Sequence, residues 1–265
     1  MSTVDQQKIR RTRTGLIAHD PARTQPGYTL FAPMFGDGTV HLVDMDGKSA
    51  HTWRLPYRPG LYGYLLGNGH LFYGGKVMED LARFEAWPRF KGGAVLEVDW
   101  RGRVLWEVRH PDHHHDARRL RNGTVLLLCL APLPADLARN VRGGLPGTEA
   151  DGVIYADYLV EMTTGGQVVW EWRSWEHLDP AAHPITPQDT RAEWTHGNTV
   201  AAPHFFHEPG APGLNNWVFR ALRYSPRRST QRGAPSACQH DAEGHGNGSR
   251  IGGPSEMKNG VRPDP

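Results

Sequence analysis

Hydrophobic and polar residues alternate through much of residues 27–201, and short turns rich in Gly, Asn and Asp interrupt the alternation. A period of two residues is typical of β-strands with one buried face, and Asp-Gly or Asn-Gly between two such runs indicates a hairpin. The pattern therefore predicts an all-β chain. The expected strands cover 28–32, 39–43, 50–55, 69–73, 93–98, 104–108, 124–130, 154–162 and 168–172.

Three stretches repeat one hairpin, in which an alternating strand, an acidic residue and a Gly turn precede a second strand that holds a Trp. They recur about every 55 to 65 residues, a spacing typical of repeat architectures. Radial stacking of four-stranded sheets protects the faces and edges of each sheet. We therefore predict a partial β-propeller of about three to four blades, each a four-stranded antiparallel sheet, with a β-sandwich as the alternative. The stretches are 39–55, 94–110 and 156–173, with anchors Asp44/Gly47/Trp53, Asp99/Gly102/Trp106 and Glu161/Gly166/Trp170.

Segments of helical composition at 78–89 and 133–141 lie between the repeats and are expected to be loop insertions. The recurrent Trp residues suit the interface between blades, which needs large flat side chains, and Trp194 is expected to be a core residue rather than a substrate contact. Cys129 lies in an apolar run and is expected to pack as a small buried group, a disulfide to Cys238 being the alternative.

The chain is expected to comprise a flexible lead-in (1–26), the propeller blades (27–201) and a tail (202–265). The tail contains 8 Pro and 9 Gly in 64 residues, a composition typical of disorder. The repeat stops in mid-unit at 199–201, where a turn and an apolar strand should follow. We hypothesise that a shifted reading frame or a truncated gene produces the tail.

Charge gives little indication of a partner. The net charge is +2, and the tail alone contributes +3 (eight Lys and Arg against five Asp and Glu), so residues 1–201 carry about −1. Binding to nucleic acid would need a basic stripe on a folded face, which this distribution does not predict. The N-terminus lacks the apolar segment of a secretory signal, and no apolar run is long enough to span a membrane. We expect a cytoplasmic protein.

The chain has 15 histidines, and the densest group is His113, His114 and His115, followed by Asp116. Aligning His114 with His196 of the next unit aligns Asp116 with Asn198. Both histidines then stand at the start of a strand that follows a Trp-bearing hairpin. Because equivalent positions of successive blades converge on the axis of a propeller, His114 and His196 are expected to face one pocket.

Such a pair suits two chemistries. One is group transfer through a histidine nucleophile, with a second imidazole stabilising the developing charge. The other is metal binding, because neutral imidazole and Asp116 form a common ligand set. Adjacent side chains alternate across a strand, so His113, His114 and His115 are not all expected to share the pocket. Isolated histidines (His19, His51 and His70) are expected to be surface or half-buried residues.

The histidine–aspartate stretch before Asn122-Gly123, the Trp-Thr-His-Gly-Asn stretch at 194–198 and the Trp hairpins resemble bacterial arylsulfate sulfotransferases. The likeness covers about residues 27–201. It implies a six-bladed β-propeller that moves a sulfuryl group from an aryl sulfate to an acceptor phenol through a sulfo-histidine. It also implies that no cofactor or metal is needed.

Under this resemblance, His114 and His196 correspond to supporting histidines and Asn198 to a polar neighbour. The expected arginine after Asn198 is missing, and His240, which follows Gln239, is the weak counterpart of the nucleophile. The resemblance implies an aryl sulfate and a phenol as partners, with no nucleic acid and no membrane. It leaves open whether the chain is active, whether a second copy supplies missing blades, and whether relatives are periplasmic. The alternatives are a non-catalytic propeller that binds a ligand or protein, and a metal-dependent hydrolase using His113, His114 or His115 with His196 and Asp116.

Overall fold

The computed structural model describes residues 15–201 and the strand Val218–Arg220. The chain divides into two units, Met1–Ser225 and Pro226–Pro265, and every described residue belongs to the first. The predicted disorder of the tail and the role of His240 fall outside the described residues. The domain boundaries proposed from the sequence stay predictions.

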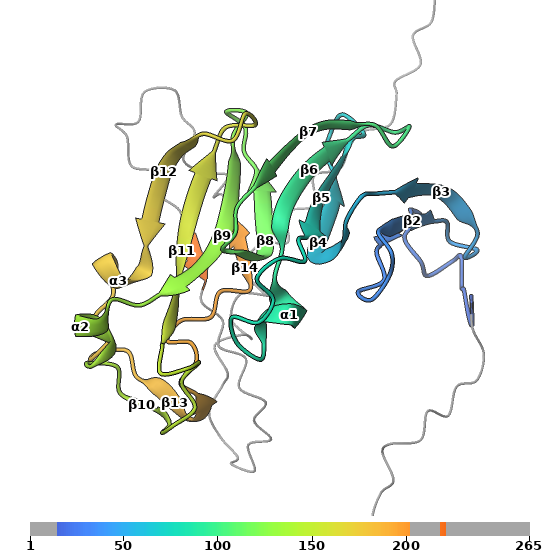
Figure 1. The fold of residues 1–265 in the computed structure, drawn as a ribbon. Coiled ribbons are helices and arrows are strands. Elements are labelled where there is room, and N and C mark those ends of the chain that lie inside the picture. The colour runs from blue at the N-terminus through green and yellow to red at the C-terminus, as the bar shows by residue number, and fades with distance from the viewer. Residues whose placement is uncertain (1–14, 202–217, 221–265) are drawn as a thin grey trace, which may run out of the picture. The chain divides into compact units, whose positions relative to one another are not determined.

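Two four-stranded antiparallel sheets form the centre of the described fold, and each is a meander whose strands lie side by side in chain order (Figure 1). The strands of the first sheet are β4 (Arg58–Leu65), β5 (Leu71–Lys76), β6 (Gly93–Val98) and β7 (Val104–Arg109). Those of the second are β8 (His113–Arg119), β9 (Val125–Pro132), β11 (Tyr155–Met162) and β12 (Val168–Arg173).

Smaller sheets precede and follow these two. β1 (Thr29–Phe31), β2 (Thr39–Val43) and β3 (Ser49–Arg54) form a three-stranded antiparallel sheet. β14 (Thr199–Ala201) pairs with β15 (Val218–Arg220) in an antiparallel sheet, and β10 (Gly143–Leu145) pairs with β13 (Ile185–Thr190) in a parallel one.

Helices in the described residues are short. α1 (Trp87–Phe90), α2 (Ala135–Ala138) and α3 (Ser174–His177) have four residues each. The expected helical segments 78–89 and 133–141 are therefore reduced to single turns, because neither forms a continuous apolar stripe that a neighbouring element could bury. No helix in residues 15–201 has the length and hydropathy needed to cross a membrane.

First strands of neighbouring sheets contact one another around β8. β8 contacts β4 of the preceding sheet and β14 of the following one, and Figure 1 shows β8 between β9 and β4. Four-stranded meanders with first strands adjacent are the arrangement of blades in a β-propeller. The predicted all-β fold built from propeller blades is confirmed.

Burial along the middle strands explains why the blades stack. Every residue of β6 is buried, and successive side chains of β6 point to opposite faces. Val95 joins an apolar cluster with Leu127 and Val160 of the second sheet, whereas Leu96 joins a cluster with Trp53 of the three-stranded sheet. Each face of a blade thus forms the core with a different neighbour, and no single blade buries its apolar surface alone.

Trp53 occupies such an interface, as the recurrence of Trp predicted. Its side chain is 1% exposed, and its Nε1–H donates to the carbonyl of Asp99, 3.1 Å away in the β6–β7 turn of the next sheet. Trp106 is half-buried and donates to the Glu97 carboxylate at 2.8 Å, while the Arg119 guanidinium of the next sheet lies 5.1 Å from its ring centre. Trp194 is buried and donates to the carbonyl of His183 at 2.8 Å, so its expected core position is confirmed.

Replacing Trp53 should therefore destabilise the fold through lost packing more than through the lost hydrogen bond. We expect Trp53→Ala to lower the free energy of unfolding by about 3–5 kcal/mol because it leaves a large cavity. Trp53→Phe, which keeps most of the ring contact, should cost clearly less. Denaturant unfolding of both variants measures the difference, and equal costs would contradict a packing role.

Candidate functional site

The histidine run lies at a bulge in β8. The register of β8 with β9 shifts between His113 and Ala117, and His115 has a φ of 50°, in the left-handed region that non-glycine residues seldom adopt. The bulge breaks the alternation of side chains along the strand. His113, His114 and His115 are all buried, with exposures of 1%, 3% and 8%. As expected, the three rings do not all join one cluster, because His113 contacts backbone groups whereas His114 and His115 contact each other.

His113 is held by backbone groups. Its Nδ1 accepts the Gly93 N–H at 3.0 Å, and its Nε2 lies 3.3 Å from the carbonyl of Asp116, to which it donates. A Cβ at Gly92 would lie 2.4 Å from His113 Nδ1, so Gly92 permits a close approach rather than a turn. Burial, reinforced by the charge of a nearby histidine, lowers the pKa of His113 to about 3. This ring is a neutral structural group.

His114 and His196 belong to one cluster, with His115 between them. Nδ1 of His114 lies 2.7 Å from Nδ1 of His115, and the ring centres of His115 and His196 are 5.0 Å apart at 84°. His196 precedes β14, the first strand of the next blade. The adjacency of β8 and β14 therefore brings together two residues more than 80 positions apart in the chain.

His114 and His196 each lie next to a carboxylate. His114 Nε2 lies 3.0 Å from Oδ1 of Asp157, a β11 residue with 0% exposure. The other oxygen of Asp157 accepts the Gly197 N–H at 2.9 Å, which fixes the segment that carries His196. His196 Nδ1 in turn contacts the carboxylate of Glu193. Sequence reasoning missed both acids, although an Asp in the middle of the largely apolar strand 154–162 was a signal.

The protonation states within the cluster differ. Burial lowers the pKa of His196, but the hydrogen bond and charge of Glu193, the charge of Asp157 and a hydrogen bond to Asn198 outweigh it, and the net pKa is raised. Burial and the neighbouring histidines lower the pKa of His115 to about 2. The cluster thus joins a ring that favours a proton to a ring that stays neutral, and Asn198 lies beside the former.

Asp116 lies outside this cluster of imidazoles. Its Oδ2 accepts the Thr199 hydroxyl at 2.5 Å and the Val200 N–H at 3.0 Å, and the Arg118 guanidinium is 3.2 Å away. Burial raises the pKa of Asp116 despite these partners. Its carboxylate ties β8 to β14 and so holds two blades together. In the part of the chain that the structure describes, no group of three or more His, Cys, Asp or Glu side chains is arranged to hold a metal ion.

The α1 segment supplies an aromatic wall. The Phe90 ring stacks on His115 with centres 4.6 Å apart and meets His196 edge-on at 5.9 Å. The buried Trp87 lies 6.3 Å from His114, and the Nζ of the buried Lys91 is 5.6 Å from the Trp87 ring. The insertion between β5 and β6 thus covers the histidines with flat apolar surface.

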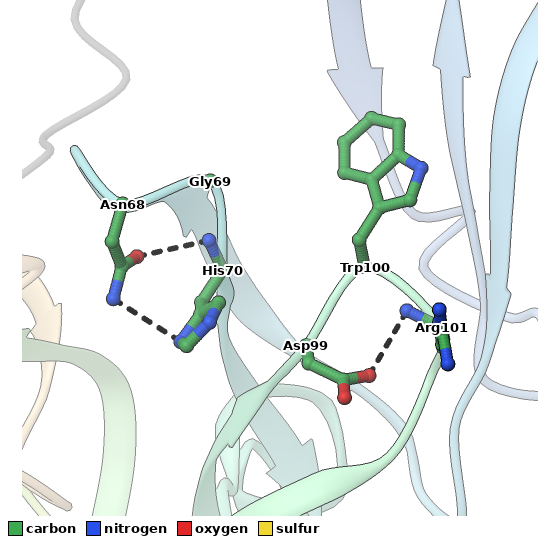
Figure 2. A pocket seen from close by; sticks show the side chains of 6 residues that line it. All are labelled: Asn68, Gly69, His70, Asp99, Trp100 and Arg101. Atoms are coloured by element: carbon green, nitrogen blue, oxygen red, sulfur yellow. Dashed lines mark hydrogen bonds between the residues drawn. The ribbon is translucent and has the colours of Figure 1, made fainter.

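A separate, open cavity of about 430 Å³ lies between the β4–β5 and β6–β7 turns (Figure 2). Figure 2 shows Asn68 bonded to the backbone and ring of His70, and Asp99 accepting the Arg101 N–H. These polar groups satisfy one another within the turns. His70 also contacts Glu97 at 2.7 Å and is half-buried, as expected from its isolated position. None of the clustered histidines lines this cavity.

Comparison with family models matches residues 65–204, more than half of the chain, to "Arylsulfotransferase (ASST)". The chain belongs to the arylsulfotransferase family. The match contains the histidine cluster, Asp157 and Glu193, and ends before His240. The resemblance found in the sequence motifs is thereby confirmed at the level of the family.

Solved structures similar to this arylsulfotransferase-family chain include a protein of unknown function from Bacteroides caccae and BamB from Moraxella catarrhalis. They have 17% and 13% identity and TM-scores of 0.33 and 0.25. Each match covers 56% of this chain and 46% of the other, so the chain spans about half the length of these structures. A search of curated proteins gave no match. The fold assignment rests on the sheet topology.

Removal of the Glu193 charge should lower the pKa of His196. We expect Glu193→Gln to shift the NMR titration of His196 to lower pH, because the carboxylate favours the imidazolium. The pair stabilises the fold at low pH, and this contribution is lost as the pH rises through the raised pKa of His196. Glu176→Gln, an exposed change on α3, is the control, and an unmoved His196 titration in Glu193→Gln would contradict the assignment.

Stability should fall on mild acidification because His113 and His115 stay neutral when folded. Their folded pKa values of about 3 and 2 lie below the ordinary value of about 6.5. Their contribution to the free energy of unfolding is therefore complete above pH about 6.5. It is lost as the pH falls towards the pKa values of the folded state. The slope should be about 1.4 kcal/mol per pH unit for each ring.

His115→Asn should reduce the slope of stability against pH by the contribution of one ring, because Asn does not titrate. Asn also tolerates the left-handed backbone at this position. Denaturant unfolding at several pH values between 7 and 5 measures it. His177→Asn on α3, which removes an imidazole outside the cluster, is the control. A His115→Asn slope equal to that of the parent protein would show that His115 is protonated in the fold.

Proposed function

We propose that this protein transfers a sulfuryl group from an aryl sulfate to an acceptor phenol through a sulfo-histidine intermediate. Membership of the arylsulfotransferase family supports the class of reaction. The single observation that carries the proposal is the cluster of His114, His115 and His196 beside an aromatic wall. A sulfate ester is an anion attached to an aromatic ring, and the cluster offers a group suited to each part.

His196 is the best candidate for binding the sulfate oxygens. Its raised pKa favours the imidazolium, and a cation in a partly dry site stabilises charge that develops on oxygen. Phe90, which faces both His115 and His196, offers a surface on which the aromatic ring of a substrate can stack. Trp87 extends that surface behind His114.

The identity of the nucleophilic histidine is part of this proposal. An imidazole that attacks sulfur must present an unprotonated nitrogen, and the S–O bond to the departing phenolate then breaks as the N–S bond forms. His240 is our candidate from the motif, and it lies outside the described residues. The cluster then supplies charge stabilisation by His196 and polar support by His114 and Asn198. We also propose that the protein is located in the cytoplasm.

Incubation of the full chain with an aryl sulfate, without acceptor, should yield one added sulfuryl group in the intact mass and release of one phenol. His196→Ala should slow formation of the adduct by about 100-fold, because an oxyanion-stabilising group is lost. His177→Ala, whose ring stacks on Trp172, is the matched control and should react as the parent does. Absence of both adduct and phenol release would refute the activity and favour a propeller that only binds its ligand.

A further inference from the structure

The short contact between His114 and His115 constrains where their protons lie. A neutral imidazole has one N–H donor and one acceptor nitrogen. The two Nδ1 atoms are 2.7 Å apart, so one of them carries a hydrogen and the other a lone pair. The remaining nitrogen of His114 decides between the two possibilities.

Asp157 determines whether Nε2 of His114 carries a hydrogen. Nε2 of His114 and Oδ1 of Asp157 are buried 3.0 Å apart without forming a regular hydrogen bond, and neither atom has a hydrogen-bond partner among the described residues. A lone pair on Nε2 would face a carboxylate oxygen that only accepts, so we place the hydrogen of His114 on Nε2. The lone pair of a neutral His114 is then on Nδ1, and the hydrogen between the rings belongs to His115 Nδ1.

We propose that Asp157 is a positioning residue that, through His114, leaves Nε2 of His115 unprotonated, and that this nitrogen accepts a hydrogen bond from the hydroxyl of the acceptor phenol. The identity of the phenol rests on the function proposed above; the proton arrangement does not. An aryl sulfate has no hydroxyl hydrogen to donate, so a lone pair at this position distinguishes acceptor from donor. The site then has two ends, with His196 for the sulfate oxygens and His115 for the phenol.

The surroundings of His115 agree with this role. Its Nε2 makes no hydrogen bond to any residue in the ranges that the structure describes, whereas its Nδ1 is engaged by His114. The Phe90 ring stacks on the imidazole at 4.6 Å and offers an apolar aromatic neighbour. The left-handed backbone at His115 is costly for a residue with a side chain, and such strain is concentrated at functional sites.

The proton positions can be measured directly by NMR. In the full-length protein labelled with ¹⁵N-histidine, long-range ¹H–¹⁵N correlations distinguish a protonated from an unprotonated ring nitrogen, and His115→Asn identifies the His115 signals. Between pH 6 and 8 we expect a proton on Nδ1 and a lone pair on Nε2. A proton on Nε2 would overturn the proposal, and this measurement needs no variant at Asp157.

Asp157→Asn should invert the arrangement. Because Oδ2 of Asp157 accepts the Gly197 N–H, the Asn carbonyl must stay at that position, and its NH₂ group then faces His114 Nε2. His114 becomes an acceptor at Nε2 and a donor at Nδ1, which moves the proton of His115 to Nε2. Asp116→Asn, a nearby buried acid without contact to His114, is the matched control and should leave the His115 signals as in the parent. A folded Asp157→Asn protein with the parental arrangement would refute the proposal.

Kinetics separates this inference from the proposed function. In a transfer assay, Asp157→Asn should raise KM for the phenol by about 10-fold, the effect of one lost hydrogen bond to a buried group. Formation of the sulfuryl adduct from the donor should change much less. Equal loss in both half-reactions would refute the role in acceptor recognition. Failure of the parent protein to form any adduct would refute the function while the proton arrangement is still decided by NMR.

Discussion

Burial of polar side chains where the first strands of neighbouring blades meet is the constraint on which the rest of this structure depends. A carboxylate or imidazole taken from water must find partners, because an unpaired buried charge costs several kcal/mol. Asp116 on β8 finds them on β14, and Asp157 on β11 finds them in His114 and Gly197. The contacts of Asp116 with β14 and of Asp157 with Gly197 cross from one blade to the next, whereas Asp157 and His114 lie in the same sheet. Neighbouring blades are therefore joined by specific polar contacts as well as by apolar packing.

The same constraint shapes the local backbone. The bulge in β8 and the left-handed backbone of His115 change where the consecutive histidine side chains point. Gly92, which precedes β6, has no Cβ and so leaves room for the His113 ring. The strain at His115 and the tight contact at Gly92 are balanced by packing on both sides of β8. Such balance is found where a site needs side chains in fixed positions.

The histidines differ in pKa because their surroundings differ. Burial lowers the pKa of His113 and His115, whereas the hydrogen bond and charge of Glu193 outweigh burial and raise the pKa of His196. Phe90 and Trp87 lie against these rings and make their surroundings less polar, which strengthens electrostatic effects. The proposed transfer between two aromatic substrates would use such a site to hold an anion and an uncharged hydroxyl side by side.

The sequence determined the blades and the identity of the principal histidines. Period-two alternation and the recurrent Trp hairpins located β2, β6, β7, β11 and β12 within a residue or two, because these strands carry their own pattern and their own turns. The alignment of repeats also placed His114 and His196 at equivalent positions, where the blades bring them into one cluster.

Only the tertiary structure decided what lies between these two histidines. Hydrophobic and polar residues do not alternate in strand β4 or at the bulge in β8, so the sequence pattern predicts neither. Contacts with neighbouring blades set their conformations. Nothing in the sequence marks Asp157 or Glu193 as the partner of a histidine. The packing of β11 and of the segment before β14 brings each carboxylate next to an imidazole. Proton positions depend on distances of about 3 Å between residues far apart in the chain, and local sequence does not encode those distances.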